Sequence, residues 1–243
     1  MRELLGALLI SFGLCVSSEK ATAKSVEFVD EQNLQLRHLE PVARQMKVFF
    51  RDEFPTKIRV LSKKGNGLSK FDCATNTIVI DEAVPPTRKS AVIAHEAAHL
   101  GLCQLTYGAN LKTEFRFLDE GFATLEEFRF LRQTEKFRER ALRLSLEQLK
   151  IGNLGFDRVF DWRAYSRDSS GRINSYSYAV GASFIMMLFD RGGETNLRRF
   201  FTDLGRTENF EESLKSIFQM NLMEAEKEWK RFIINKGQFG AFS

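Results

Sequence analysis

The stretch 91-AVIAHEAAHLGLC-103 constrains the fold of this chain more than any other. It is apolar on nearly every side of a helix, which predicts a helix buried inside the protein. Three ionisable side chains, His95, Glu96 and His99, interrupt this apolar surface. Because a buried charge is costly unless it is paired or bound to a metal, these three groups need partners elsewhere in the sequence.

The two histidines have the spacing of a metal site. Positions i and i+4 share a helix face, so the rings of His95 and His99 can meet at one ion, with Glu96 beside it. This HExxH arrangement is typical of two zinc ligands and a general base. The alternative is a structural helix whose histidines bond backbone carbonyls, but that interpretation gives Glu96 no partner. The other histidine, His38, lies in a polar segment and is predicted to be a surface residue.

A third ligand is needed, because catalytic zinc sites usually have three protein ligands and one open position. No histidine follows His99, and the best candidate lies in 117-FLDEGFATLEEF-128. Glu120 is either that ligand or a residue at the start of a helix, where the helix dipole favours a carboxylate. Asp119 is a plausible N-cap for the same helix.

These motifs have a family resemblance. The segment 95-HEAAH-99, followed by 118-LDEGFAT-124, resembles the gluzincin metallopeptidases, most closely the aminopeptidase-N type and the peptidase MA-like families. The resemblance implies a thermolysin-like (zincin) catalytic domain. It also implies that His95, His99 and Glu120 hold one Zn²⁺ ion, with Glu96 as the general base.

A further match concerns a tyrosine. The segment 178-YAVGASFIMML-188 resembles the helix that presents a catalytic tyrosine in those enzymes, which implies this role for Tyr178, with Tyr176 as the substitute. The alternative is a core tyrosine. Aminopeptidase specificity is not expected, because no Gly-x-Met-Glu-Asn segment is present. Thr124 stands where thermolysin-type enzymes have an acidic residue, so Glu127 is the candidate for orienting a histidine.

The predicted fold is α+β and mainly helical, with a small N-terminal β-sheet and a helical C-terminal lobe. Strands are predicted at 57–62 and 77–81, and the segment 77-TIVID-81 is interpreted as an exposed edge to which a peptide could add. The loop 104–114 is expected to be exposed, and 152–172 irregular. Helices are predicted over most of 26–53, then over 89–103, from about 119 to 131, and over 135–150, 173–190, 194–204, 210–218 and 222–235. Residues 24–243 should form a single domain, with a small α/β lobe to about 110 and a helical lobe from about 111.

The N-terminus is typical of an export signal. Met1 and Arg2 precede an apolar run at residues 4–16, and cleavage is predicted after Ala23 rather than Ser18. The alternative is an uncleaved membrane anchor. Removal of the signal leaves Cys73 and Cys103, which form either one disulfide or two buried thiols.

Charge and composition narrow the function further. The net charge of +4 comes from 36 basic and 32 acidic residues that are interspersed, so nucleic acid is not an expected partner. The leading hypothesis is an exported, periplasmic or secreted, zinc metallopeptidase that acts on peptides or proteins and has no stable membrane insertion after signal cleavage. The alternatives are a catalytically silent relative that binds a peptide or a cell-envelope partner, and a structural protein without metal.

Overall fold

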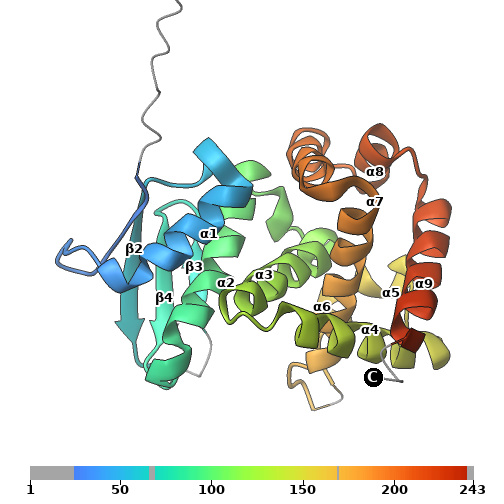
Figure 1. The fold of residues 1–243 in the computed structure, drawn as a ribbon, viewed down its shortest axis with the longest axis horizontal. Coiled ribbons are helices and arrows are strands. Elements are labelled where there is room, and N and C mark those ends of the chain that lie inside the picture. The colour runs from blue at the N-terminus through green and yellow to red at the C-terminus, as the bar shows by residue number, and fades with distance from the viewer. Residues whose placement is uncertain (1–24, 66–68, 169, 240–243) are drawn as a thin grey trace, which may run out of the picture.

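The computed structural model of the chain describes residues 25–65, 69–168 and 170–239 (Figure 1). The predicted signal, residues 1–23, lies outside this part. The N-terminal portion combines a small sheet with two helices. Its elements are β1 (Glu27–Val29), α1 (Glu40–Phe50), β2 (Lys57–Lys63), β3 (Lys70–Asp72), β4 (Thr77–Asp81) and α2 (Pro86–Leu105).

The four strands lie in the order β1-β2-β4-β3. β2 is parallel to both β1 and β4, whereas β3 is antiparallel to β4 and pairs Phe71 with Ile78. The prediction that residues 77–81 form an exposed edge is therefore wrong. β4 has a strand on each side and is largely buried, as its run of β-branched residues favours. The edge next to it is β3, which also contacts α2.

Helix α2 carries the histidine motif through the middle of the molecule, between the sheet and the next long helix (Figure 1). It begins with Pro86 at its first turn, where a fixed φ suits a helix start. Small residues let its neighbours approach closely. At Gly101 an added Cβ would lie 2.4 Å from the ring of Phe50 in α1, so this contact requires glycine.

The C-terminal portion consists mainly of helices (Figure 1). The predicted break near residues 190–194 is present, since Gly193 (φ 68°) interrupts the long helix α7 (Ser175–Thr207). The segment predicted to be irregular contains two single-turn helices, α5 (Phe156–Val159) and α6 (Trp162–Tyr165). The helices of this portion are α3 (Arg116–Phe130), α4 (Thr134–Lys150), α5 (Phe156–Val159), α6 (Trp162–Tyr165), α7 (Ser175–Thr207), α8 (Phe210–Phe218) and α9 (Leu222–Phe239).

Two glycines set the separation of α3 and α7. A Cβ on Gly121 would lie 2.3 Å from the carbonyl carbon of Gly181, and a Cβ on Gly181 would lie 2.2 Å from the carbonyl oxygen of Phe117. The two backbones therefore touch at this crossing. Because Glu120 adjoins Gly121 and Tyr178 lies one turn before Gly181, the crossing brings these two site residues to the same region.

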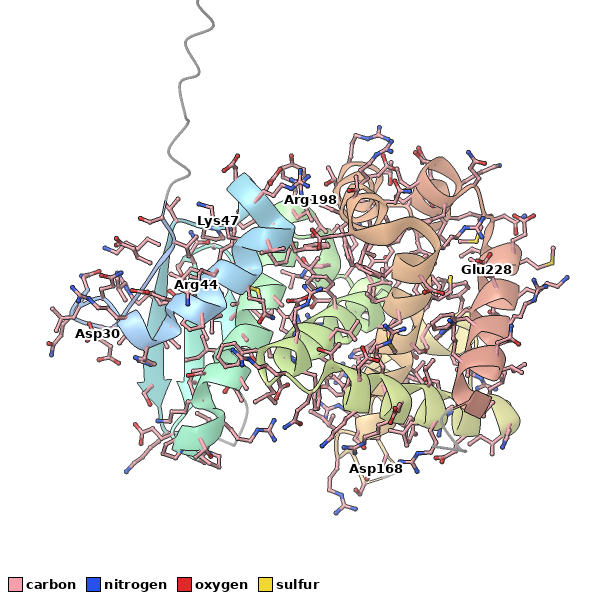
Figure 2. The ribbon with its side chains drawn as sticks, viewed as in Figure 1. Asp30, Arg44, Lys47, Asp168, Arg198 and Glu228 are labelled. Atoms are coloured by element: carbon pink, nitrogen blue, oxygen red, sulfur yellow. A yellow bond between two sulfur atoms is a disulfide. The ribbon has the colours of Figure 1, made fainter. Side chains whose placement is uncertain are left out.

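The buried apolar residues form one cluster that extends from β1 to α9. Within it, Phe184 packs against Trp229 of α9 with ring centroids 5.1 Å apart. The indole of Trp229 donates a hydrogen bond to Ser183 Oγ (2.9 Å), so its one polar atom is satisfied. At the surface, Arg198 of α7 forms an ion pair with Glu53, just after α1, and so links the two portions (Figure 2).

Two further expectations differ from the structure. Residues 26–53 contain β1 as well as α1, because a three-residue strand can form where a neighbouring strand accepts it. The loop 104–114 is partly buried, since the side chains of Thr106 and Asn110 are 0% and 2% exposed. In the described part of the chain, no helix combines the length and apolarity needed to cross a membrane.

Candidate metal centre and cleft

Three predicted ligands converge on one point. The Nε2 atoms of His95 and His99 lie 3.1 Å apart. Oε2 of Glu120, on α3, lies 3.5 Å from the first and 3.4 Å from the second. These three side chains form the group that could hold a metal ion in the described residues.

The triangle of ligand atoms fits a zinc ion. Zinc bound tetrahedrally at about 2.0–2.2 Å holds its ligand atoms roughly 3.3–3.6 Å apart, close to the three distances found. The chemistry of the donors agrees with this size. In neutral histidines that carry their proton on Nδ1, the facing Nε2 atoms and the Glu120 oxygen are all acceptors, so a cation is the natural occupant of the space between them.

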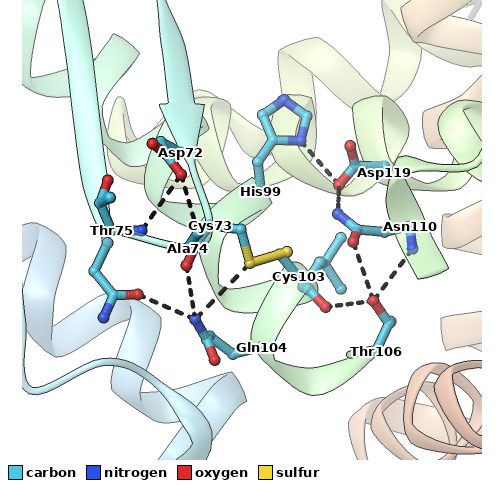
Figure 3. The surroundings of a disulfide bond; sticks show 12 residues. Asp72, Cys73, Ala74, Thr75, His99, Cys103, Gln104, Thr106, Asn110 and Asp119 are labelled. Carbon is cyan, nitrogen blue, oxygen red and sulfur yellow. Dashed lines mark hydrogen bonds and ion pairs between the residues drawn. A yellow bond between two sulfur atoms is a disulfide. The ribbon is translucent and has the colours of Figure 1, made fainter. Parts of the chain in front are cut away.

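Asp119 contacts the imidazole of His99 at Nδ1, the ring nitrogen that faces away from the other two candidate ligands. This nitrogen lies 2.9 Å from Oδ1 of Asp119, whose side chain is fully buried (Figure 3). Asn110 donates a hydrogen bond to the same oxygen (2.8 Å). A carboxylate in this position keeps the proton on Nδ1 and leaves Nε2 free to bind a metal. Asp119 is therefore not an N-cap, because α3 already begins at Arg116.

The imidazole of His95 has a different partner. Its Nδ1 lies 3.4 Å from Oε2 of Glu127, the residue that the sequence suggested for orienting a histidine. Glu127 in turn accepts a hydrogen bond from Arg88 at the start of α2 (2.5 Å). Thr124 does not replace the missing acidic residue, since its hydroxyl donates to the backbone carbonyl of Glu120 (2.7 Å).

Arg116 joins the two carboxylates of α3. One guanidinium nitrogen pairs with Oδ2 of Asp119 and the other with Oε1 of Glu120. Glu120 therefore directs Oε1 to the arginine and Oε2 to the histidines. Sequence reasoning missed Arg116, although its position three and four residues before two acids on one helix is a recognisable signal.

The site is strongly coupled electrostatically. Burial alone would lower the pKa of both histidines, but the facing carboxylates outweigh it and raise the pKa of His95 to about 10 and of His99 to about 9. Burial likewise opposes ionisation of Glu120, yet His99, His95 and Arg116 hold its pKa well below the usual value. Burial raises the pKa of Glu96, although the two histidines oppose this shift.

Glu96 and Tyr178 line the same cleft as the three ligands. Glu96 is 7% exposed, and its raised pKa suits a group that takes and returns a proton. Tyr178 packs edge-on against Trp162, with ring centroids 5.8 Å apart. Burial first, and then the charge of Glu120, raise the pKa of Tyr178, so its hydroxyl stays protonated and can donate. Tyr176 instead packs against Tyr165, with centroids 6.1 Å apart.

A disulfide connects α2, the helix that carries His95 and His99, to the edge of the sheet. Cys73, just after β3, is bonded to Cys103, one helical turn beyond His99 (Figure 3). On the same strand, Phe71 stacks on the ring of His99 with centroids 5.0 Å apart. The bond therefore fixes β3 beside His99. The other histidine, His38, is exposed and remote from this group in sequence.

The cleft has a volume of about 500 Å³, within the usual range for ligand sites. One wall comes from β3 and α2, and the other from α3, α4 and α7. The three candidate ligand atoms thus lie in a cleft between the two portions of the chain.

Comparison with known proteins agrees with the class of the site. Residues 44–147 match the family model Peptidase_M78, the IrrE N-terminal-like domain, which is a zinc metallopeptidase-like family. No curated protein matches the chain. The match covers less than half of the chain; it includes the histidine motif and Glu120 and ends before Tyr178. It supports a metallopeptidase-like domain, while the narrower gluzincin assignment stays a prediction.

Proposed function

We propose that this chain is a zinc metallopeptidase of the gluzincin type, with a thermolysin-like fold, that hydrolyses peptide bonds. The observation that carries the proposal is the convergence of His95, His99 and Glu120 on one point in a cleft that Glu96 also lines. A small sheet beside the helix with the two histidines, followed by a helical portion, supports the fold assignment.

In the proposed hydrolysis, each of these residues has a separate role. His95, His99 and Glu120 would hold one Zn²⁺ ion, which when bound lowers the pKa of water and polarises the scissile carbonyl. Glu96 accepts a proton from the attacking water and delivers it to the leaving amine. Tyr178 donates a hydrogen bond to the oxygen on which negative charge develops. Asp119 and Glu127 keep the two imidazoles oriented.

The experiment that tests this proposal compares the parent with Glu96→Gln and with an exposed control, Glu31→Gln. Cleavage of casein and of a peptide library by Glu96→Gln should fall at least about 100-fold, since general acid–base catalysis contributes this much or more. Zinc content, measured by atomic spectroscopy, should be unchanged in both variants and lost in His99→Ala. Equal cleavage by Glu96→Gln and the parent would contradict the mechanism.

The second candidate is a catalytically silent protein of the same fold that binds a peptide or a cell-envelope partner. The matched family suggests peptidase activity but also includes regulators, so a function without catalysis is also compatible with the match. A parent that binds zinc in equimolar amount and cleaves no member of the peptide library would establish it. The presence of Glu96 together with all three ligands favours the enzyme.

We also propose that the protein is exported to the periplasm or secreted. The support is the Cys73–Cys103 disulfide, because such bonds persist in oxidising compartments. Mass spectrometry of the purified protein should find an N-terminus near Lys24. An intact N-terminus in a membrane fraction would favour the anchored alternative.

A further inference from the structure

Beyond the three candidate ligands, the cleft is lined by the apolar side chains of Phe128 on α3 and of Phe137 and Leu144 on α4, which together are called the apolar recess. The rings of Phe128 and Phe137 stack with centroids 4.2 Å apart and planes 9° apart. Phe137, Arg140 and Leu144 stand at positions i, i+3 and i+7 of α4, so they share one helix face. A charged residue therefore borders the apolar recess.

The recess lies within reach of a bound peptide. Glu120, Thr124 and Phe128 follow one another at intervals of four residues along one face of α3 and all line the cleft. At 1.5 Å per residue, Phe128 stands about 12 Å from Glu120 along the helix. An extended peptide advances about 3.3 Å per residue, so the recess faces a side chain within roughly four residues of the scissile bond.

The cleft contains a positive charge that has no ion-pair partner among the described residues. Of the three carboxylates that line the cleft, Glu120 is paired with Arg116 and Glu127 with Arg88. The third, Glu96, adjoins His95 in α2 and is the proposed general base. Arg140 is exposed, and within the described residues no acidic side chain forms an ion pair with it. An anionic group on the substrate is its natural partner.

We propose that this cleft selects peptides in which a large apolar side chain adjoins an acidic residue. The apolar side chain enters the recess of Phe128, Phe137 and Leu144, and the carboxylate pairs with Arg140. This inference rests on the proposed peptidase function and names its substrate class.

A set of quenched fluorescent peptides tests the proposal from the substrate side. The peptides share one scaffold and differ at a single pair: leucine with glutamate, leucine with glutamine, leucine with lysine, or alanine with glutamate. The kcat/KM of the zinc-loaded parent should fall up to about fivefold from glutamate to glutamine, the range of an exposed ion pair, and further for lysine. It should fall at least about tenfold when alanine replaces leucine. Equal values for glutamate and lysine would overturn the proposal.

A pair of variants tests it from the protein side. Arg140→Glu should reverse the preference between glutamate and lysine peptides. The matched control Arg143→Glu changes a 67% exposed arginine of the same helix that does not line the cleft, and it should keep the parental preference. The same shift in both variants would show that a general change of charge is responsible and would refute the assignment to Arg140.

Binding separates this inference from the proposed function. Fluorescence anisotropy of the same peptides with Glu96→Gln, and with Glu96→Gln combined with Arg140→Glu, measures preference without turnover. A parent that cleaves no peptide while Glu96→Gln prefers the glutamate peptide would refute the peptidase and support the cleft specificity. Cleavage by the parent without a preference for the glutamate peptide would support the peptidase and refute the cleft specificity.

Discussion

The two histidines of the candidate metal site share one helix and one carboxylate, Glu120, but their surroundings differ. His99, the inner histidine, has a side chain only 3% exposed, and its Nδ1 lies 2.9 Å from fully buried Asp119. His95, the outer histidine, is 15% exposed, and its Nδ1 lies 3.4 Å from Glu127. One end of the site is enclosed by the protein, and the other borders the cleft.

This difference teaches how the site is built. At the inner end, Asp119 is held by Asn110 and Arg116, and the disulfide lies one turn further along α2. At the outer end, Glu127 has Arg88 as its support, and that arginine is 56% exposed. We infer that the inner end fixes the position of the metal, whereas the outer end tolerates change.

The largest effect concerns pH. The pKa of each histidine is raised in the folded, metal-free protein, so the stability it contributes is fully present below about pH 6.5 and is lost as the pH rises through about 9 and 10. The free energy of unfolding of the metal-free protein should fall by roughly 3 kcal/mol in total between pH 6.5 and 9.5, because the Nε2 atoms lie 3.1 Å apart and the two rings titrate as one coupled pair. Urea denaturation measures this change.

The zinc-loaded protein is the control for that measurement. Zinc binds neutral imidazole, so its loaded form should keep its stability over the same range of pH. Ionisations elsewhere in the chain affect both forms equally and cancel in the difference. A metal-free protein whose urea midpoint is constant from pH 6.5 to 9.5 would show that the histidines carry no extra proton.

The second-largest effect is expected at the inner end, when Asp119 loses its charge. Asp119→Asn keeps the shape of the side chain but removes the charge that holds the proton on His99 Nδ1. Loss of such a partner costs 10- to 100-fold in metal affinity, and the buried position of Asp119 places it near the upper limit, about 100-fold. Zinc affinity is measured by competition with a chelator, with the 76% exposed Asp157→Asn as control. An unchanged affinity would mean that Asp119 serves only folding.

Sequence patterns predicted the long elements better than the short ones. The helix predicted over 89–103 and the strand predicted over 77–81 follow from continuous apolar runs, which need no knowledge of their neighbours. β1 and β3 are three residues each, and they exist because β2 and β4 provide hydrogen-bonding partners. The missed β3 is also why residues 77–81 were assigned to an edge.

Within the site, local spacing and the family resemblance predicted which three side chains converge, but not which residues support them. His95 and His99 follow from i, i+4 geometry, and Glu120 from a resemblance to known motifs. The role of Asp119 depends on how α3 packs against α2, which sequence spacing does not specify, so a local N-cap was the simplest expectation. The same holds for Asn110, which reaches Asp119 from a loop that looked polar and exposed.

A smaller effect is expected at the outer end. Glu127→Gln removes the carboxylate near His95, but its contact is longer and partly exposed, so zinc affinity should fall about tenfold, the lower limit for such partners. The same chelator competition compares it directly with Asp119→Asn. If Glu127→Gln proved the more damaging of the two, the outer end would be the rigid one, and the comparison would have to be reversed.

The smallest effect should come from Arg88, which contacts Glu127 but not the histidines. Arg88→Ala removes an ion pair with one exposed partner, a kind of interaction that contributes up to about 1 kcal/mol, so zinc affinity should change less than fivefold. The change should shrink further at 1 M salt, because exposed charges are screened there. Arg44→Ala, which removes an exposed pair with Glu40 in α1, is the control and should leave zinc affinity unaltered. A loss as large as that of Glu127→Gln would mean that Glu127 cannot hold its place without Arg88, and the outer end would then be a two-residue support.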